Sequence, residues 1–277
     1  MKRILVPCDF SKYSETALIF ALQLATQIEG ELLVVNVVPE SSSTPITSEL
    51  KIHALESLTR LVKSCQSPGV IVQKKILSGR FLTSVLKSVK DDNINLIVMG
   101  TRGSRGWGEY FMGSNIEKIV RTSPVPVFAV RGSMNPKSIN DIVFPCDMKL
   151  NQLEMIEQIK HLQTLFHARL QILRINTSST SSDGKIIEKL EQYAKHYQLS
   201  NFRITVLKNK NVTEGILHFT REANADMIAM ITRRKRDLKH LFTNSTTADV
   251  VNHANVLVWT CCSDQLPAKT STKNDDQ

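Results

Sequence analysis

The sequence lacks the long apolar segments that would place a protein across a membrane. No apolar run approaches the roughly 20 residues that a membrane-spanning helix needs. The opening stretch MKRILVPCDF is basic, but Asp9, Lys12 and Glu15 interrupt the apolar run that a secretory signal requires. We therefore expect a cytoplasmic protein with no membrane partner.

Cysteine is scarce and irregularly spaced. The chain has five cysteines, an odd number, with neither a C-x-x-C motif nor the spacing of a zinc site. This pattern predicts reduced thiols rather than a disulfide framework. Cys261 and Cys262 form a vicinal pair beside a polar segment, 263–277, which lacks apolar periodicity and which we expect to be disordered. A redox role for the pair stays open as an alternative.

Signatures of common enzymes are also missing. The chain has no H-E-x-x-H motif, no triad order of Ser, His and Asp, and no paired-carboxylate signature, and none of its seven histidines has a metal-ligand spacing. We therefore predict no catalytic residue and no metal site. The net charge of +9 is partly local, because residues 233–239 form a dense basic patch. Without interleaved aromatic residues, this patch is more typical of a solvated loop than of a nucleic-acid surface.

Glycine, in contrast, is concentrated at one place. Residues 96–115 read LIVMGTRGSRGWGEYFMGSN and hold five of the chain's eleven glycines. Glycine lets a backbone approach a ligand closely, and the first N–H groups of a following helix are unpaired donors at the positive end of its dipole. The spacing Gly100-x2-Gly103-x9-Gly113-Ser114 lacks the lysine of a P-loop and is longer than a G-x-G-x-x-G fingerprint. The stretch therefore predicts a phosphate-binding loop.

The chain also repeats itself. The segment Ile4–Asp9 (ILVPCD) recurs as Ile142–Asp147 (IVFPCD), and residues 95–99 recur as 226–230. Such self-similarity indicates a tandem duplication. We place the two domains at 1–132 and 138–262, with a linker at Gly132–Ser138. We expect mobile loops after the second strand of each half, at 41–45 and 177–184.

Short apolar β-branched runs alternate with longer amphipathic ones in each half, which predicts βα units. We therefore expect an α/β fold with two tandem open twisted parallel sheets of Rossmann-like type. If the strand order in each is 3-2-1-4-5, the ends of the first and fourth strands are neighbours. A helix over 13–29 would start at Ser11 or Ser14 and end at Gly30. The predicted strands lie near residues 2–7, 31–38, 70–77, 95–99 and 125–130 in the first half, and near 140–145, 169–176, 202–208, 226–231 and 255–259 in the second.

Taken together, the glycine loop and the segment Arg3–Ser11 (RILVPCDFS) resemble the universal stress protein family, whose ATP-binding members carry G-x2-G-x9-G-[S/T] after a buried strand. The resemblance implies that the two halves pack as a pseudo-dimer, with the fifth strands, Val125–Val130 and Val256–Trp259, paired edge to edge. It also implies an ATP site, with or without Mg²⁺, in the first half.

This resemblance implies a role for each motif residue. Asp9 would face the nucleoside, Val37 would line the adenine slot, and Gly100 would admit the ribose and phosphates. Structural alternatives stay open, because Asp9 is also typical of a turn and Val37 of a core. The implied cofactor-binding residues are Pro7, Asp9, Val37, Met99, Gly100 and Gly103, with Gly113, Ser114 and Asn115 at the distal phosphates.

The second half has lost the glycines of the loop, which become Ile231, Arg234 and Asn244. Each substitution adds a side chain where the first half has backbone clearance, so we expect a degenerate second domain. The resemblance then implies a stress-response sensor or regulatory module that binds ATP in its N-terminal domain and is able to form a homodimer. Three alternatives stay open: a slow ATPase or phosphotransferase, a nucleic-acid-binding module using residues 233–239, and a structural protein with an empty crevice.

Overall fold

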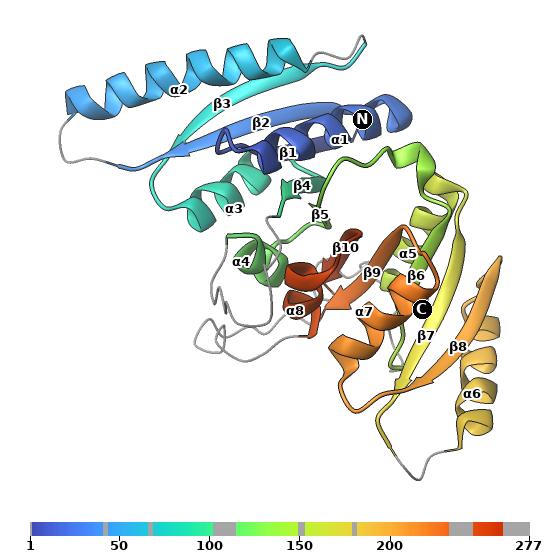
Figure 1. Cartoon of the computed structure of the whole chain (residues 1–277). Helices are drawn as coiled ribbons and strands as arrows, with labels where there is room; N and C mark the ends of the chain where they lie inside the picture. The colour runs from blue at the N-terminus through green and yellow to red at the C-terminus, as the bar shows by residue number, and fades with distance from the viewer. Residues whose placement is uncertain are drawn as a thin grey trace, which may run out of the picture.

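The computed structural model describes residues 2–40, 44–65, 69–101, 115–148, 153–178, 182–232 and 246–262. These residues form one ten-stranded sheet with helices on both faces (Figure 1). The strand order is β3-β2-β1-β4-β5-β10-β9-β6-β7-β8. Each half therefore has the predicted 3-2-1-4-5 order, and the prediction of the fold class is confirmed.

All of the predicted strands are present, with small shifts at their ends. The first half contains β1 (Arg3–Pro7), α1 (Lys12–Ile28), β2 (Glu31–Val38), α2 (Thr44–Ser64), β3 (Val72–Ser78), α3 (Phe81–Asp91), β4 (Leu96–Gly100), α4 (Asn115–Thr122) and β5 (Val127–Val130). After the short 3-10 helix η1 (Pro136–Ser138), the second half contains β6 (Asp141–Pro145), α5 (Leu153–Phe166), β7 (Arg169–Asn176), α6 (Asp183–His196), β8 (Phe202–Lys208), α7 (Val212–Glu222), β9 (Met227–Thr232), α8 (Thr246–His253) and β10 (Leu257–Cys262).

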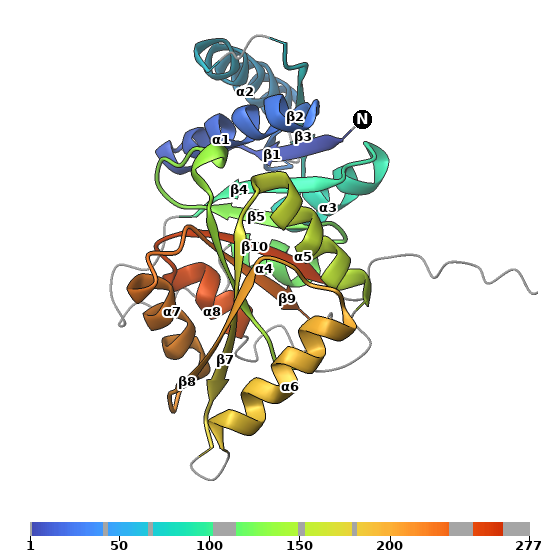
Figure 2. The ribbon, with the colours of Figure 1, turned by 90° about the vertical axis from the view of Figure 1, so that its right-hand side faces the viewer.

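Strand alternation divides the buried residues into two layers, one on each face of the sheet. Ile4 and Val6 of β1 belong to one layer, and Leu5 belongs to the other. Helices α1, α2, α5 and α6 cover the first layer, called here the first core. Helices α3, α4, α7 and α8 cover the second core. Both cores continue through the two halves, which Figure 2 shows one above the other.

The two halves join through their fifth strands. β5 and β10 pair antiparallel, with Phe128 opposite Trp259. Across this junction Phe20 of α1, Phe128 and Phe166 of α5 form an edge-to-face series, with ring centroids 5.6 and 6.3 Å apart. The pairing closes two strand edges that would otherwise expose unpaired backbone groups. The predicted edge-to-edge pairing of the fifth strands is therefore confirmed.

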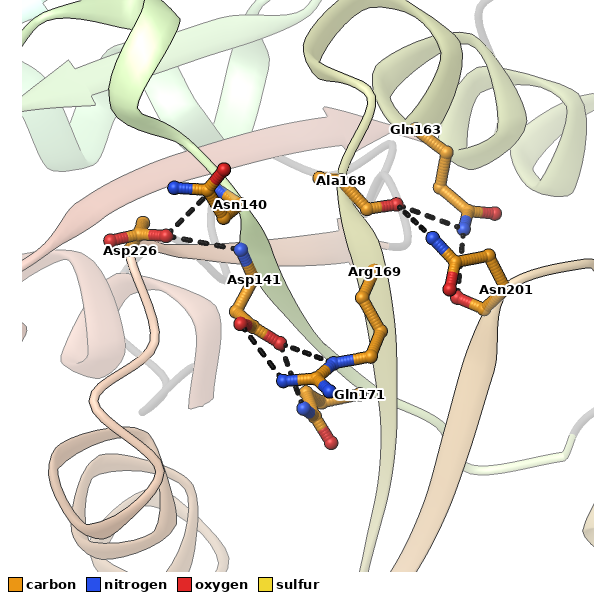
Figure 3. Close-up of polar contacts among 8 residues, drawn as sticks. All are labelled: Asn140, Asp141, Gln163, Ala168, Arg169, Gln171, Asn201 and Asp226. Atoms are coloured by element: carbon orange, nitrogen blue, oxygen red, sulfur yellow. Dashed lines mark hydrogen bonds and ion pairs between the residues drawn. The ribbon is translucent and has the colours of Figure 1, made fainter.

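A cross-strand ion pair holds the amino ends of the first two strands in each half. Arg3 of β1 pairs with Glu31 of β2 at 3.1 Å, and Asp141 of β6 pairs with Arg169 of β7 at 2.8 Å. The register places the partners directly opposite each other in both halves, so the contact is the same although its signs are reversed. Figure 3 shows Asp141 accepting two hydrogen bonds from the Arg169 guanidinium and one from Gln171.

The two halves share a second contact at the amino ends of their strands, between the first strand and the residue before the fourth. Asn95 Oδ1, just before β4, accepts a hydrogen bond from the backbone N–H of Arg3 at 2.9 Å. In the second half Asp226 Oδ2 accepts from the backbone N–H groups of Asn140 and Asp141 at 2.8 and 3.0 Å (Figure 3). The duplication has therefore preserved the contacts that fix the amino edge of both half-sheets.

Local capping explains the helix that was predicted over 13–29. Ser11 is its N-cap, and Ser11 Oγ accepts a hydrogen bond from the backbone N–H of Ser14 at 3.3 Å. At the other end Glu29 has a φ of 51°, in the left-handed region. Gly30 follows this C-cap, and its backbone N–H donates to the Ala25 carbonyl oxygen at 2.9 Å. A side chain at Gly30 would lie 2.8 Å from the carbonyl oxygen of Lys2.

The loops predicted after the second strands are shorter than expected. α2 begins at Thr44 and α6 begins at Asp183, so each predicted loop loses its last two residues to a helix. Pro45 suits the first turn of α2, where no N–H is needed, and an acidic residue at the start of α6 complements the helix dipole. Residues 41–43 and 179–181 lie outside the described part of the chain.

The cysteines are free thiols, as predicted. β10 continues to Cys262, beyond the predicted end at residue 259, because Cys261 and Cys262 pair with β9 and are buried. The vicinal pair therefore belongs to the sheet. The segment 263–277, for which disorder was predicted, lies outside the described residues.

The ion pair of Asp141 with Arg169 should make the free energy of unfolding depend on pH. Burial of Asp141 acts to raise its pKa, but hydrogen bonds from Arg169 and Gln171 outweigh this effect and hold the pKa below its ordinary value. A carboxyl group with a lowered pKa stabilises the fold above its unfolded pKa, and this contribution is lost as the pH falls through the folded pKa. Arg169 is half-exposed, so solvent screens the pair, and we expect Asp141→Asn to lower the free energy of unfolding at neutral pH by about 1 kcal/mol.

Thermal unfolding followed by circular dichroism, at neutral pH and at a series of acid pH values, checks this expectation. The difference between the wild type and the variant should shrink as the pH falls through the folded pKa of Asp141, because the wild type then loses its negative charge as well. Asp91→Asn, at the exposed end of α3, is a matched control. A difference that does not change with pH would contradict the electrostatic explanation.

Candidate functional site

The strand order brings the two sequence motifs to one edge of the sheet. β1 lies between β2 and β4, and the chain leaves β1 for β2 and β3 before it returns on the other side to β4 and β5. Ligands of open α/β sheets bind at such a reversal point, outside the carboxyl ends of the strands. Pro7 ends β1 and Gly100 ends β4. The segment around Asp9 and the start of the glycine loop are therefore neighbours, as the sequence predicted.

Three of the predicted residues share one face at this edge. Pro7 has the same strand parity as Leu5, whose side chain lies in the second core. Val37 of β2 and Met99 of β4 are half-buried and pack against that same core. Pro7 itself is buried. Together Pro7, Val37 and Met99 make an apolar floor across three neighbouring strands, on the side that α3 and α4 cover.

Asp9 follows this floor and is held by a tight turn. Its Oδ1 accepts hydrogen bonds from the backbone N–H of Ser11 at 3.0 Å and from the Ser11 hydroxyl at 2.5 Å. Burial acts to raise the pKa of Asp9, but the hydrogen bonds from Ser11 outweigh it and keep the pKa below its ordinary value. Asp9 is therefore an ionised, exposed turn residue at neutral pH. Neither bond uses Oδ2, so a turn role and a ligand role are compatible.

Gly100 faces the opposite side of the sheet, toward α1. A methyl group built there would lie 2.5 Å from the carbonyl carbon of Tyr13 and 3.1 Å from the backbone nitrogen of Ser14, and closer still to the Tyr13 carbonyl oxygen. Carbon atoms in contact prefer about 3.5–4.0 Å, so no side chain fits. The missing side chain of Gly100 is therefore explained by the close approach of a helix.

Asn115 opens α4, which leads from the carboxyl end of β4 to the start of β5, so its exposed N-terminus lies at the same edge. Gly103, Gly113 and Ser114 lie outside the described residues. The structure therefore brings together Pro7, Asp9, Val37, Met99, Gly100 and Asn115 at one edge of the sheet.

Two residues near this edge have roles that the sequence did not predict. Asn36 Nδ2 donates to the carbonyl oxygen of Cys8 at 2.8 Å and fixes the chain as it leaves β1. Tyr13 contributes the carbonyl group that meets Gly100. A polar residue within the apolar run of β2 was the available signal for Asn36, whereas the contact of Tyr13 depends on tertiary packing that no local pattern reports.

The corresponding edge of the second half has diverged. Asp147 occupies the position of Asp9, and Arg174 replaces Asn36, with Nη1 3.5 Å from the carbonyl oxygen of Cys146. Ile231 of β9 replaces Gly100. Residues 149–152, which correspond to Ser11–Ser14, lie outside the described part of the chain. The second half thus keeps the acidic residue at this edge and replaces its glycine.

A tandem Rossmann-like α/β protein with this arrangement at its strand ends matches one family in sequence. A sequence model of the Universal stress protein family matches residues 1–131 and, a second time, residues 139–261. The chain belongs to the universal stress protein family, as a tandem member, and the prediction from its motifs is confirmed.

Individual relatives agree with this assignment. Universal stress protein Slr1230 of Synechocystis sp. is 22% identical over 290 residues, covering 94% of this chain and 99% of its own. A universal stress protein of Thermus aquaticus is 30% identical over 135 residues, covering 47% of this chain and 98% of its own. The crystal structure of a universal stress protein from Archaeoglobus fulgidus has a TM-score of 0.75 at 20% identity, over 94% of this chain and 98% of that one. At this identity the structural likeness shows the fold.

The described residues lack two features. No helix among them has the length and apolar character to cross a membrane. No group of three or more His, Cys, Asp or Glu side chains in the same ranges is arranged to hold a metal ion.

The turn at Asp9 makes a direct prediction. Ser11→Ala removes the hydroxyl donor and the N-cap of α1, so we expect the pKa of Asp9 to rise toward its ordinary value and the free energy of unfolding to fall by about 1 kcal/mol. An NMR titration that follows the Asp9 carboxyl carbon measures the pKa. Ser11→Thr keeps the hydroxyl and serves as the control. A pKa that is the same in wild type and Ser11→Ala would refute this account of the turn.

Proposed function

We propose that the N-terminal domain binds ATP at the carboxyl ends of β1, β2 and β4, and that the protein acts as a sensor or regulatory module in the stress response. One observation carries the proposal: Asp9 follows the apolar floor of Pro7, Val37 and Met99, at the strand ends where the strand order reverses. A nucleoside needs this combination, because its base packs on apolar side chains while its ribose hydroxyls and exocyclic amine donate to an acceptor.

In this proposal the phosphates extend from Gly100 toward the start of α4. Asn115 opens that helix, whose first N–H groups and dipole attract anions. Gly103 and Gly113 would let the intervening backbone approach the phosphates. Ser114 would cap α4 and also donate to a phosphate oxygen, because a hydroxyl both accepts and donates.

Family membership adds support for a nucleotide ligand. Some universal stress proteins bind adenine nucleotides, and one solved structure of the family is a complex with cAMP. A magnesium ion would arrive with the phosphates and keep most of its water, since the described residues offer no cluster of three potential metal ligands.

The proposed activity is binding rather than turnover. The Asp9 carboxylate has a pKa held below its ordinary value, which makes it a weak general base for activating water. We assign no nucleotide to the second domain, because Ile231, Arg234 and Asn244 stand where the first half has glycine. That domain would serve as the structural or regulatory partner of the first.

Because only the first domain is proposed to bind ATP, we expect one ATP per chain. Isothermal titration calorimetry of the whole protein should give a stoichiometry near one, because only the first half keeps Gly100, Gly103 and Gly113. A stoichiometry near two would show that the second domain binds as well, and a protein that binds no ATP would refute the proposed function.

The glycine loop makes a second prediction. Gly103→Val should weaken ATP binding by about tenfold or more, roughly 1.4 kcal/mol, because a branched side chain fills backbone clearance next to the phosphates. Thermal stability should change little. Arg234→Val, at the equivalent position of the second half, is the matched control and should bind ATP as the wild type does. Equal affinity in both variants would mean that this loop does not hold the phosphates.

A further inference from the structure

The contact between Gly100 and α1 links two parts of the proposed site, the end of β4 and the turn that holds Asp9. Tyr13 and Ser14, whose backbone leaves no room for a side chain at Gly100, form the first turn of α1. The same turn begins at Ser11, whose hydroxyl accepts from the backbone N–H of Ser14 and donates to Asp9. A continuous series of contacts therefore runs from the end of β4 through α1 to the Asp9 carboxylate.

The second half differs at this position. Ile231 places a branched side chain where the first half has Gly100, and Asp147 is still present at the position of Asp9. The second domain has thus kept the acidic residue and replaced the glycine.

We propose that Gly100 is a positioning residue, whose lack of a side chain seats the first turn of α1 on the end of β4 and thereby holds Asp9 beside the nucleotide. The glycine motif then does more than bind phosphate, because its first glycine, Gly100, acts on Asp9 through the first turn of α1. The loss of nucleotide binding that we assign to the second domain follows from Ile231 as well as from the changed loop. This inference rests on the proposed ATP site for its consequence but not for the contact itself.

The test compares Gly100→Ala with Gly184→Ala. Gly184 lies in α6, and a methyl group there meets nothing closer than 3.7 Å, so this control adds the same atoms without a clash. Each folded variant is measured well below its melting temperature for the Asp9 pKa, by NMR titration, and for the ATP dissociation constant, by calorimetry. A general loss of stability would lower the melting temperature without moving the Asp9 pKa of the folded protein.

We expect Gly100→Ala to raise the Asp9 pKa toward its ordinary value, because the displaced turn releases the Ser11 hydrogen bonds, and to weaken ATP binding by about tenfold or more. Gly184→Ala should match the wild type in both measurements. A folded Gly100→Ala protein with the wild-type Asp9 pKa and wild-type affinity would overturn the proposal.

Two further outcomes are distinguishable. If the wild type binds no ATP, the proposed function fails, but the Asp9 titration still decides whether Gly100 positions the turn. If Gly100→Ala does not fold, Ser11→Ala interrupts the same series at its other end without touching β4. Weakened ATP binding by Ser11→Ala, with binding kept by Ser11→Thr, would then support the series of contacts, and unchanged binding by Ser11→Ala would overturn it.

Discussion

The antiparallel pairing of β5 with β10 is the contact on which the rest of the architecture depends. Without it, each half would end in an edge strand with unpaired N–H and C=O groups over a core open on one side. The pairing turns two five-stranded units into one sheet, and it lets each core continue from one half into the other. Phe128 lies at the centre of this junction, between the rings of Phe20 and Phe166.

The amino ends and the carboxyl ends of the strands differ in how far the two halves have stayed alike. At the amino edge the ion pair of Arg3 with Glu31 becomes Asp141 with Arg169, and the sheet tolerates the exchange because attraction between opposite charges does not depend on which strand carries which sign. The carboxyl edge has no such symmetry. A position that needs the absence of a side chain, such as Gly100, has no equivalent substitute, and the second half carries Ile231 there.

Most of the fold was predictable because its signals are local. Apolar β-branched runs located the strands, and the repeated ILVPCD-like segment revealed the two halves. The pairing of the two fifth strands with each other was predicted from the family resemblance, because no residue in the chain specifies it. At the site, the ends of the predicted first and fourth strands placed Asp9 and Gly100 together. The contact of Gly100 with Tyr13 was missed because it depends on how closely a helix approaches a neighbouring strand. The described residues do not include Gly103, Gly113 or Ser114, so their placement stays a prediction.

The junction also determines how the two halves are able to communicate. Because β5 and β10 run in opposite directions while the strands within each half are parallel, the carboxyl ends of the two halves reach opposite edges of the sheet. Pro7 and Gly100 therefore lie at one edge, and Pro145 and Ile231 lie at the other. One small molecule bound at either edge cannot touch both. Among the described residues, any influence of the second half on the first passes mechanically through the shared sheet and through helix packing on both of its faces, where α4 packs against α8 and where Phe20 and Phe166 pack against Phe128.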